Sequence, residues 1–154
     1  FFERYVQYLL CDISKKKGAV EINNPHYSIR FSKRPLWGLN YLEPDIIVQK
    51  GEEQIVVDAK YKSHLFNWNK DSEELKDTFR HDLHQLLAYC SLSGMNKKQA
   101  LLVYPFNDFI CHQMTVNSSL IASEVQIFMV GVPLEKNRIE DVKSKLNEII
   151  SFSV

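Results

Sequence analysis

Two aspartates flank a short segment whose pattern predicts a β-hairpin. Apolar runs at residues 46–48 and 55–57 follow Asp45 and precede Asp58, and polar residues that include Gly51 join the runs. If Gly51-Glu52 is a two-residue turn, the numbers of paired residues add up to 103. This register places Asp45 directly opposite Asp58, so the two carboxylates lie on one face of the hairpin.

A lysine is expected to join this pair of acids. Side chains alternate along a strand, so Lys60 emerges on the same face as Asp58, two residues further on. Adjacent carboxylates repel each other unless a positive charge joins them. A hard divalent cation with oxygen ligands is the simplest candidate. The segment therefore predicts a cation site beside an ammonium group.

Composition indicates an ordinary globular chain. The 154 residues are 45% hydrophobic and 25% charged, with 19 basic and 19 acidic side chains. We expect one domain over residues 1–154, without a global electrostatic attraction to nucleic acid. The three cysteines are isolated and predict neither a disulfide framework nor a zinc ribbon. No run is long enough to span a bilayer and no signal peptide is visible, so we expect a cytoplasmic protein without membrane contact.

Periodicity and turn residues predict the elements that position the acids. The expected elements are a helix over residues 1–17, strands over 27–32, 44–49 and 54–61, a mobile loop over 62–77, a helix over 78–92 that stops at Ser93-Gly94, strands over 99–104, 109–116 and 124–132, and a helix over 138–150. The two hairpin strands are apolar on both faces, which predicts helices above and below the sheet. The expected fold class is α/β, a mixed sheet flanked by helices. Because Phe1 already lies inside an apolar pattern, we expect these residues to be the C-terminal part of a longer chain.

Five short motifs resemble a known nuclease family. They are Phe2-Glu3-Arg4-Tyr5-Val6, Pro44-Asp45-Ile46, Asp58-Ala59-Lys60-Tyr61-Lys62, Gln85-Leu86-Leu87-Ala88-Tyr89 and Leu101-Leu102-Val103-Tyr104-Pro105. Together they resemble the PD-(D/E)xK nuclease superfamily, and more narrowly the nuclease domain of the McrC component of McrBC-type 5-methylcytosine restriction systems. The resemblance covers about residues 1–105. It implies a restriction-endonuclease-like fold with an α-β-β-β-α-β core.

The resemblance also implies roles for individual residues. Asp45, Asp58 and the main-chain carbonyl of Ala59 would hold Mg²⁺, with Mn²⁺ as a substitute. Lys60 would position or deprotonate the attacking water and stabilise charge on the phosphate. Gln85 would orient Lys60 or that water, and Glu3 would assist the metal site, often through water. The expected activity is Mg²⁺-dependent hydrolysis of DNA phosphodiesters.

The resemblance further implies partners. The substrate would be double-stranded DNA, including methylated DNA, and cleavage would depend on a GTP-hydrolysing AAA+ motor subunit. The 154 residues contain no P-loop G-x-x-x-x-G-K-[ST] motif, so nucleotide hydrolysis is assigned to another chain. Cutting both strands with single active sites favours a dimer. Two other functions stay open: a non-catalytic nuclease-fold module that binds nucleic acid or assembles a complex, and a restriction or repair nuclease that needs no motor.

Several residues carry alternative interpretations. Gln85 and Tyr89 lie one turn apart and could form an exposed pair on a helix, and Glu3 could simply favour a helix N-terminus. His81 and His84 have a spacing that could bind zinc, but no carboxylate completes the set nearby. The lysines at 15–17 suit either DNA phosphate or a solvated helix end. Phe66 and Trp68 could stack on bases, bind a partner or fold back as a small cluster.

Overall fold

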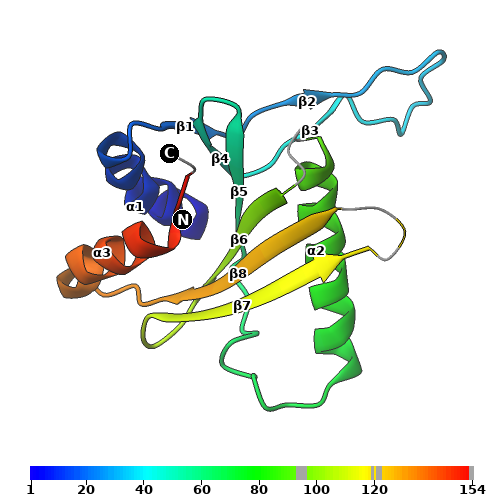
Figure 1. Ribbon diagram of the computed structural model, residues 1–154. Coiled ribbons are helices and arrows are strands. Elements are labelled where there is room, and N and C mark those ends of the chain that lie inside the picture. The colour runs from blue at the N-terminus through cyan, green and yellow to red at the C-terminus, as the bar shows by residue number, and fades with distance from the viewer. Residues whose placement is uncertain (93–96, 119, 121–122, 153–154) are drawn as a thin grey trace.

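The computed structural model describes residues 1–92, 97–118, 120 and 123–152, so the predicted stop at Ser93-Gly94 lies outside the described residues. Figure 1 shows the order of the elements along the chain. They are α1 (Phe2–Lys16), β1 (Val20–Asn23), β2 (Tyr27–Ser28), β3 (Tyr41–Leu42), β4 (Ile46–Lys50), β5 (Glu53–Ala59), α2 (Glu73–Ser91), β6 (Lys97–Pro105), β7 (Ile110–Asn117), β8 (Glu124–Val132), a 3₁₀ turn (Lys136–Arg138) and α3 (Ile139–Ile149).

A mixed sheet organises the part of the chain that the structure describes. Its six strands lie in the order β1-β4-β5-β6-β8-β7. β1, β4 and β5 pair antiparallel, β6 runs parallel to both β5 and β8, and β7 returns antiparallel to β8. The parallel pairing of β5 with β6 requires a crossover, which α2 supplies. The predicted mixed sheet is confirmed.

Helices cover both faces of this sheet, as the two-sided apolar pattern predicted (Figure 1). On one face, α1 and α3 pack on alternate sheet residues such as Val48, Val57 and Leu101. On the other face, α2 packs on the intervening residues, including Val56 and Leu102. The central strands are therefore buried on both sides, which fixes the direction of every side chain at their ends. None of the described helices is long and apolar enough to cross a bilayer.

The predicted strand over residues 27–32 is wrong in extent and in place. The strand that pairs with β4 is β1, for which no strand was predicted. Asn24 adopts a positive φ of 50°, and the chain then leaves the sheet. Only Tyr27 and Ser28 are extended in β2, and they pair with β3 in a separate two-stranded sheet. The alternation of Ile29 and Phe31 therefore does not reflect burial against the main sheet.

The second helix begins five residues before the predicted start at Thr78. The Ser72 hydroxyl accepts a hydrogen bond from the Leu75 amide at 3.3 Å, which satisfies one free donor of the first turn. Glu73 and Glu74 follow and favour the positive end of the helix dipole. The predicted loop over 62–77 is thus too long, because the capping residue and the first turn of the helix are themselves polar and resemble a loop in composition. Like β1, β3 was not predicted, and the remaining predicted helices and strands start and end within about two residues of their predicted limits.

Candidate active site

The hairpin register predicted from the turn is confirmed. Ile46 pairs with Val57, so Asp45, which precedes Ile46, lies opposite Asp58, which follows Val57. Gly51 has a φ of 61°, as a two-residue turn with glycine at its first central position requires. The two acids therefore meet at the end of the hairpin away from the turn.

Burial and close contact change the chemistry of the acid pair. Asp58 is only 3% exposed, and Asp45 Oδ2 accepts a hydrogen bond from the Ala59 amide at 2.8 Å. Burial, the hydrogen-bonded contact with Asp58 and the charge of Asp58 raise the pKa of Asp45 to about 8, and the more distant charge of Glu3 acts in the same direction. At neutral pH, Asp45 accordingly holds a proton. This proton relieves the repulsion between the two carboxyl groups, as a bound cation would.

Lys60 lies where alternation along β5 predicts. Its Nζ is 2.9 Å from Asp58 Oδ2. Burial alone lowers the pKa of Lys60, but the charges of Asp58, Asp82 and Asp45 outweigh burial, and the net pKa is raised. The side chain therefore stays an ammonium group beside the acids.

Gln85 and Tyr89 connect this ammonium to the rest of the fold. Lys60 Nζ donates to Gln85 Oε1 at 2.6 Å, and Gln85 Nε2 donates to the Tyr89 hydroxyl at 3.1 Å. The Tyr89 hydroxyl donates in turn to the main-chain oxygen of Glu43 at 3.3 Å. Tyr89 is only 5% exposed, so the two residues do not form an exposed helix pair. They link α2 to the strand entry two residues before Asp45.

Asp82 was missed by sequence analysis. It is fully buried on α2, Lys62 Nζ donates to its Oδ1 at 2.6 Å, and Lys60 Nζ lies 3.9 Å from the same atom. Its position one turn before Gln85 was the available signal, because residues at i and i+3 share a helix face. The sequence alone does not place that helix face over Lys60, because the docking of a helix on a sheet is decided by tertiary contacts.

Glu3 is brought to the edge of the site by α1. Its Oε1 accepts from Asn24 Nδ2 at 2.6 Å and from Gln7 Nε2 at 3.3 Å. Glu3 and Ala59 also line a common pocket of about 400 Å³. Its position is therefore explained by more than the helix dipole, although the contacts are to amides and not to the acid pair.

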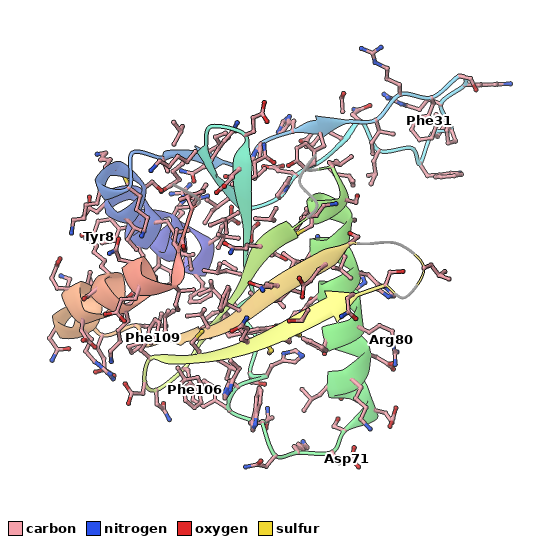
Figure 2. The ribbon with its side chains drawn as sticks, in the orientation of Figure 1. Tyr8, Phe31, Asp71, Arg80, Phe106 and Phe109 are labelled. Carbon is pink, nitrogen blue, oxygen red and sulfur yellow. The ribbon has the colours of Figure 1, made fainter. Side chains whose placement is uncertain are left out.

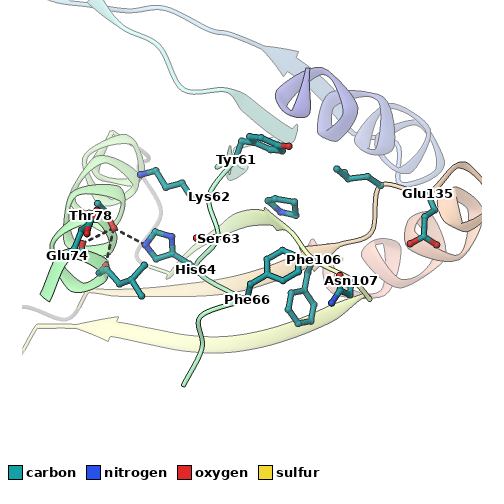
Figure 3. Close-up of a pocket in the computed structure, with 13 residues that line it drawn as sticks. Tyr61, Lys62, Ser63, His64, Phe66, Glu74, Thr78, Phe106, Asn107 and Glu135 are labelled. Atoms are coloured by element: carbon teal, nitrogen blue, oxygen red, sulfur yellow. Dashed lines mark hydrogen bonds between the residues drawn. The ribbon is translucent and has the colours of Figure 1, made fainter. Parts of the chain in front are cut away.

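A larger pocket borders the site on the other side of Lys60. It has a volume of about 950 Å³ and is lined by residues 61–64, Phe66 and Phe106, among others (Figure 3). His64 Nε2 lies 3.0 Å from Thr78 Oγ1 at its wall. None of the acids of the site lines this pocket. The pocket therefore lies beside the candidate active site and does not contain its carboxylates.

The donor set fits a magnesium ion better than zinc. Asp45 and Asp58 are paired carboxylates, one of which holds a proton that a divalent cation would displace. Within the described residues, no group of three or more His, Cys, Asp and Glu side chains is arranged around a metal position, and His81 and His84 are exposed on α2. Magnesium tolerates such a site because it retains waters and takes substrate oxygens as further ligands.

The other residues for which the sequence allowed two roles are Phe66, Trp68 and the lysines at the end of α1. Phe66 packs on Phe106 with ring centroids 5.0 Å apart, and Trp68 stacks on His112 at 4.2 Å. Both aromatic side chains in this loop therefore fold back, while remaining about half exposed. Lys15 and Lys16 lie exposed in the last turn of α1, where cations favour the helix dipole.

Comparison with known proteins identifies the family. The model of the McrBC 5-methylcytosine restriction system component matches residues 1–105, which is more than half of the chain. The chain belongs to the McrBC family. The matched residues contain all the members of the site just described, and the resemblance noted from the sequence motifs is confirmed.

A solved structure shares the fold of this McrBC family member. The matching chain comes from a half-complex of a tetradecameric assembly of Thermococcus gammatolerans McrB AAA+ hexamers with bound McrC. The two chains are 16% identical, with a TM-score of 0.57 over 97% of the present chain and 32% of the other. The present chain thus spans about a third of the length of that chain. No curated protein matches the sequence significantly.

Proposed function

We propose that this chain is the nuclease module of a modification-dependent restriction system and hydrolyses DNA phosphodiesters with Mg²⁺. One observation carries the proposal: Asp45, Asp58, Lys60 and Gln85, which come from three separate segments, meet through contacts of 2.6–2.9 Å or through the hairpin register. A purely structural ion pair does not require a second acid beside it, and the proton on Asp45 is a cost that a bound cation would remove.

Asp45, Asp58 and the Ala59 carbonyl would hold the magnesium, with Glu3 acting through water, and Mn²⁺ could replace it. When bound, such an ion polarises a phosphate oxygen and lowers the pKa of a coordinated water. Lys60 contributes a fixed positive charge where negative charge develops on the phosphate. Its raised pKa favours this role over proton abstraction.

The other residues of the site hold Lys60 in place. Gln85 accepts one ammonium hydrogen, and Tyr89 fixes the amide of Gln85 against the main chain. Asp82 neutralises part of the positive charge of Lys60 and accepts a hydrogen bond from Lys62. Such a supporting shell keeps the ammonium oriented when DNA arrives, because its partners are set by a helix and not by a loop.

The partners follow from family membership and from the matched assembly. We propose double-stranded, methylated DNA as substrate. We also propose that cleavage depends on a GTP-driven AAA+ ring of McrB type. Two copies of the chain would be needed to cut both strands. These properties belong to the whole protein, of which this chain is expected to be one part.

The test is a cleavage assay with the full-length protein, its AAA+ partner, GTP, Mg²⁺ and methylated plasmid DNA. Asp58→Asn and Lys60→Met should each reduce nicking by about 100-fold or more, because the first removes a proposed metal ligand and the second removes the positive charge placed beside the reacting phosphate. Glu52→Gln, an exposed change at the turn of the same hairpin, is the matched control and should cleave normally. Equal nicking by wild type and Asp58→Ala would end the proposal.

Metal titration separates the nuclease from a non-catalytic module of the same fold. Calorimetry should show saturable Mg²⁺ or Mn²⁺ binding that Asp45→Ala removes. A fold without bound metal and without cleavage under any partner condition would instead identify a scaffold for complex assembly.

A further inference from the structure

A slender projection leaves the body of the protein between β1 and β4. We name residues 27–42 the arm. Its stem is the pairing of β2 with β3, continued by the hydrogen bond from the Ile29 amide to the Asn40 carbonyl at 2.9 Å. Figure 1 shows the arm extending away from the sheet and helices, and Figure 2 shows Phe31 on it, far from the core. The arm therefore does not contribute to the packing of the sheet along most of its length.

The charge of the arm differs in sign from that of the remaining chain. No acid occurs between Glu21 and Glu43, whereas the arm carries Arg30, Lys33 and Arg34. Without these three cations, the rest of the chain has 16 basic and 19 acidic residues. A neutral protein has thus gathered an excess of positive charge on one projection, as expected for contact with a polyanion.

Large apolar side chains are exposed at the end of the arm. Leu36 and Trp37 are 107% and 83% exposed, and Leu39 is 61% exposed. An exposed cluster of this kind on a protein surface marks an interaction site. Cations flanking an apolar tip are the combination by which proteins hold DNA phosphates and place a side chain between base steps.

The tip is preformed by contacts within the arm. The Arg34 guanidinium donates to the Ile29 carbonyl at 3.1 Å and to the Asn40 side chain, and it lies over the Phe31 ring. The Gly38 amide closes a turn on the Pro35 carbonyl at 3.0 Å. Arg34 therefore braces the loop, whereas Arg30 and Lys33 are exposed and Leu36 and Trp37 are presented at the turn. A braced loop loses little conformational entropy when it binds.

The arm is joined directly to the candidate active site. Its second strand ends at Leu42, and Glu43 and Pro44 are all that separate it from Asp45. Trp37 lies eight residues before Asp45, so the two residues are at most about 26 Å apart, since a strand rises about 3.3 Å per residue. On B-DNA this corresponds to about eight base pairs at 3.4 Å each.

We propose that the arm is a DNA-contacting wedge: Arg30 and Lys33 bind phosphates, and Trp37 with Leu36 enters the groove and unstacks a base step within about eight base pairs of the cleaved bond. The inference rests on the proposed nuclease function and adds to it the element that grips the duplex beside the cut. The occupant is double-stranded DNA, because the cations lie next to the apolar tip and the site for phosphodiesters lies at the foot of the arm.

The test uses the full-length protein and DNA duplexes that carry 2-aminopurine at successive positions around the cut. Wild type should raise the fluorescence at one step within about eight base pairs of the cut, and Trp37→Ala should abolish this rise and weaken cleavage about tenfold. The matched control is Trp68→Ala. It removes a tryptophan that is half exposed and lies outside the arm, and it should leave the fluorescence unchanged.

A second measurement examines the cations. The Arg30→Gln and Lys33→Gln double variant should reduce the slope of log affinity against log salt by about 1.8, because each phosphate contact contributes about 0.9. Lys15→Gln with Lys16→Gln removes two exposed cations from the body and should leave the slope unchanged.

Two results would overturn the inference. If Trp37→Ala keeps wild-type fluorescence, DNA affinity and cleavage, the arm does not contact DNA. If arm variants bind DNA normally but lose association with the AAA+ partner or with a second copy in sedimentation experiments, the arm is a protein-docking surface. In both cases wild-type cleavage would persist, whereas failure of the proposed function would appear as a wild-type protein that cuts no DNA.

Discussion

Replacing Asp45 with asparagine should stabilise the metal-free protein while removing its activity. The carboxyl of Asp45 has its pKa raised from 3.8 to about 8, mainly by burial and by the neighbouring Asp58. Between these two pH values the folded chain binds a proton that the unfolded chain releases. The stability contributed by this bound proton is therefore fully present below about pH 4 and is lost as the pH rises through about 8.

The size of this effect can be bounded from the shift. About four pKa units at roughly 1.4 kcal/mol each give an upper limit of about 6 kcal/mol. Asp45 is partly accessible to water, which screens the repulsion, so we expect roughly 2 kcal/mol in practice. Asparagine keeps an acceptor for the Ala59 amide, offers a donor to Asp58 and carries no charge to repel it.

The assay is urea unfolding in the presence of a chelator at pH 4 and pH 8.5. Asp45→Asn and wild type should be nearly equal in stability at pH 4, where both the folded and the unfolded wild-type chain hold the proton, and the variant should be more stable by about 2 kcal/mol at pH 8.5. Adding Mg²⁺ at about 100 times its dissociation constant should stabilise wild type by about 2.7 kcal/mol and leave the variant unaffected.

Glu52→Gln serves as the control, since it removes an exposed carboxylate at the other end of the same hairpin and should show no pH-dependent gain. The reasoning is refuted if Asp45→Asn is no more stable than wild type at pH 8.5, or if its advantage is the same at both pH values. Either outcome would mean that the two carboxylates do not repel each other in the folded protein.

Three further substitutions test the surroundings of the site. Gln85→Ala should lower cleavage about 10- to 100-fold with an unchanged circular dichroism spectrum, because it releases the ammonium of the site without exposing the core; an unaltered rate would exclude a positioning role. Asp82→Ala should cost about 1–3 kcal/mol in urea unfolding, since it leaves Lys62 without its buried acceptor, and Lys62→Met in the same background should recover part of the loss. Gly131→Ala should cost about 1–3 kcal/mol, because the new Cβ would lie 2.7 Å from the Leu65 side chain; a neutral effect in thermal melting would show that this side chain moves aside.

The acid pair was predictable because its geometry is local. A two-residue turn fixes the register of a hairpin, so the opposition of Asp45 and Asp58 follows from counting residues. Lys60 follows from alternation along the same strand. Gln85 came instead from the family resemblance, because no local rule says which face of a distant helix covers a strand end.

The errors arose where tertiary context decides. Asp82 has no local feature that separates it from a surface acid, and only the docking of α2 on the sheet buries it. The alternation of Tyr27, Ile29 and Phe31 with polar residues predicts a half-buried strand over residues 27–32, which form only the first part of the arm. Alternation reports that two faces differ, but it does not say whether the apolar face meets the core or another molecule.

The different sequence separations within the site also bear on how it is assembled. Asp45 and Asp58 are 13 residues apart and close with a hairpin, which forms within about 1–10 μs. Gln85 reaches Lys60 only after α2 has crossed over and β6 has paired parallel to β5, whose residues lie 44 positions earlier in the sequence than their partners. Loop-closure entropy makes such non-local pairing slow. A chain leaving the ribosome would hence bring its two acids together beside Lys60 before Gln85 and Asp82 of α2 are in place to hold that ammonium group, and the hairpin would gain its final stability only when the crossover is complete.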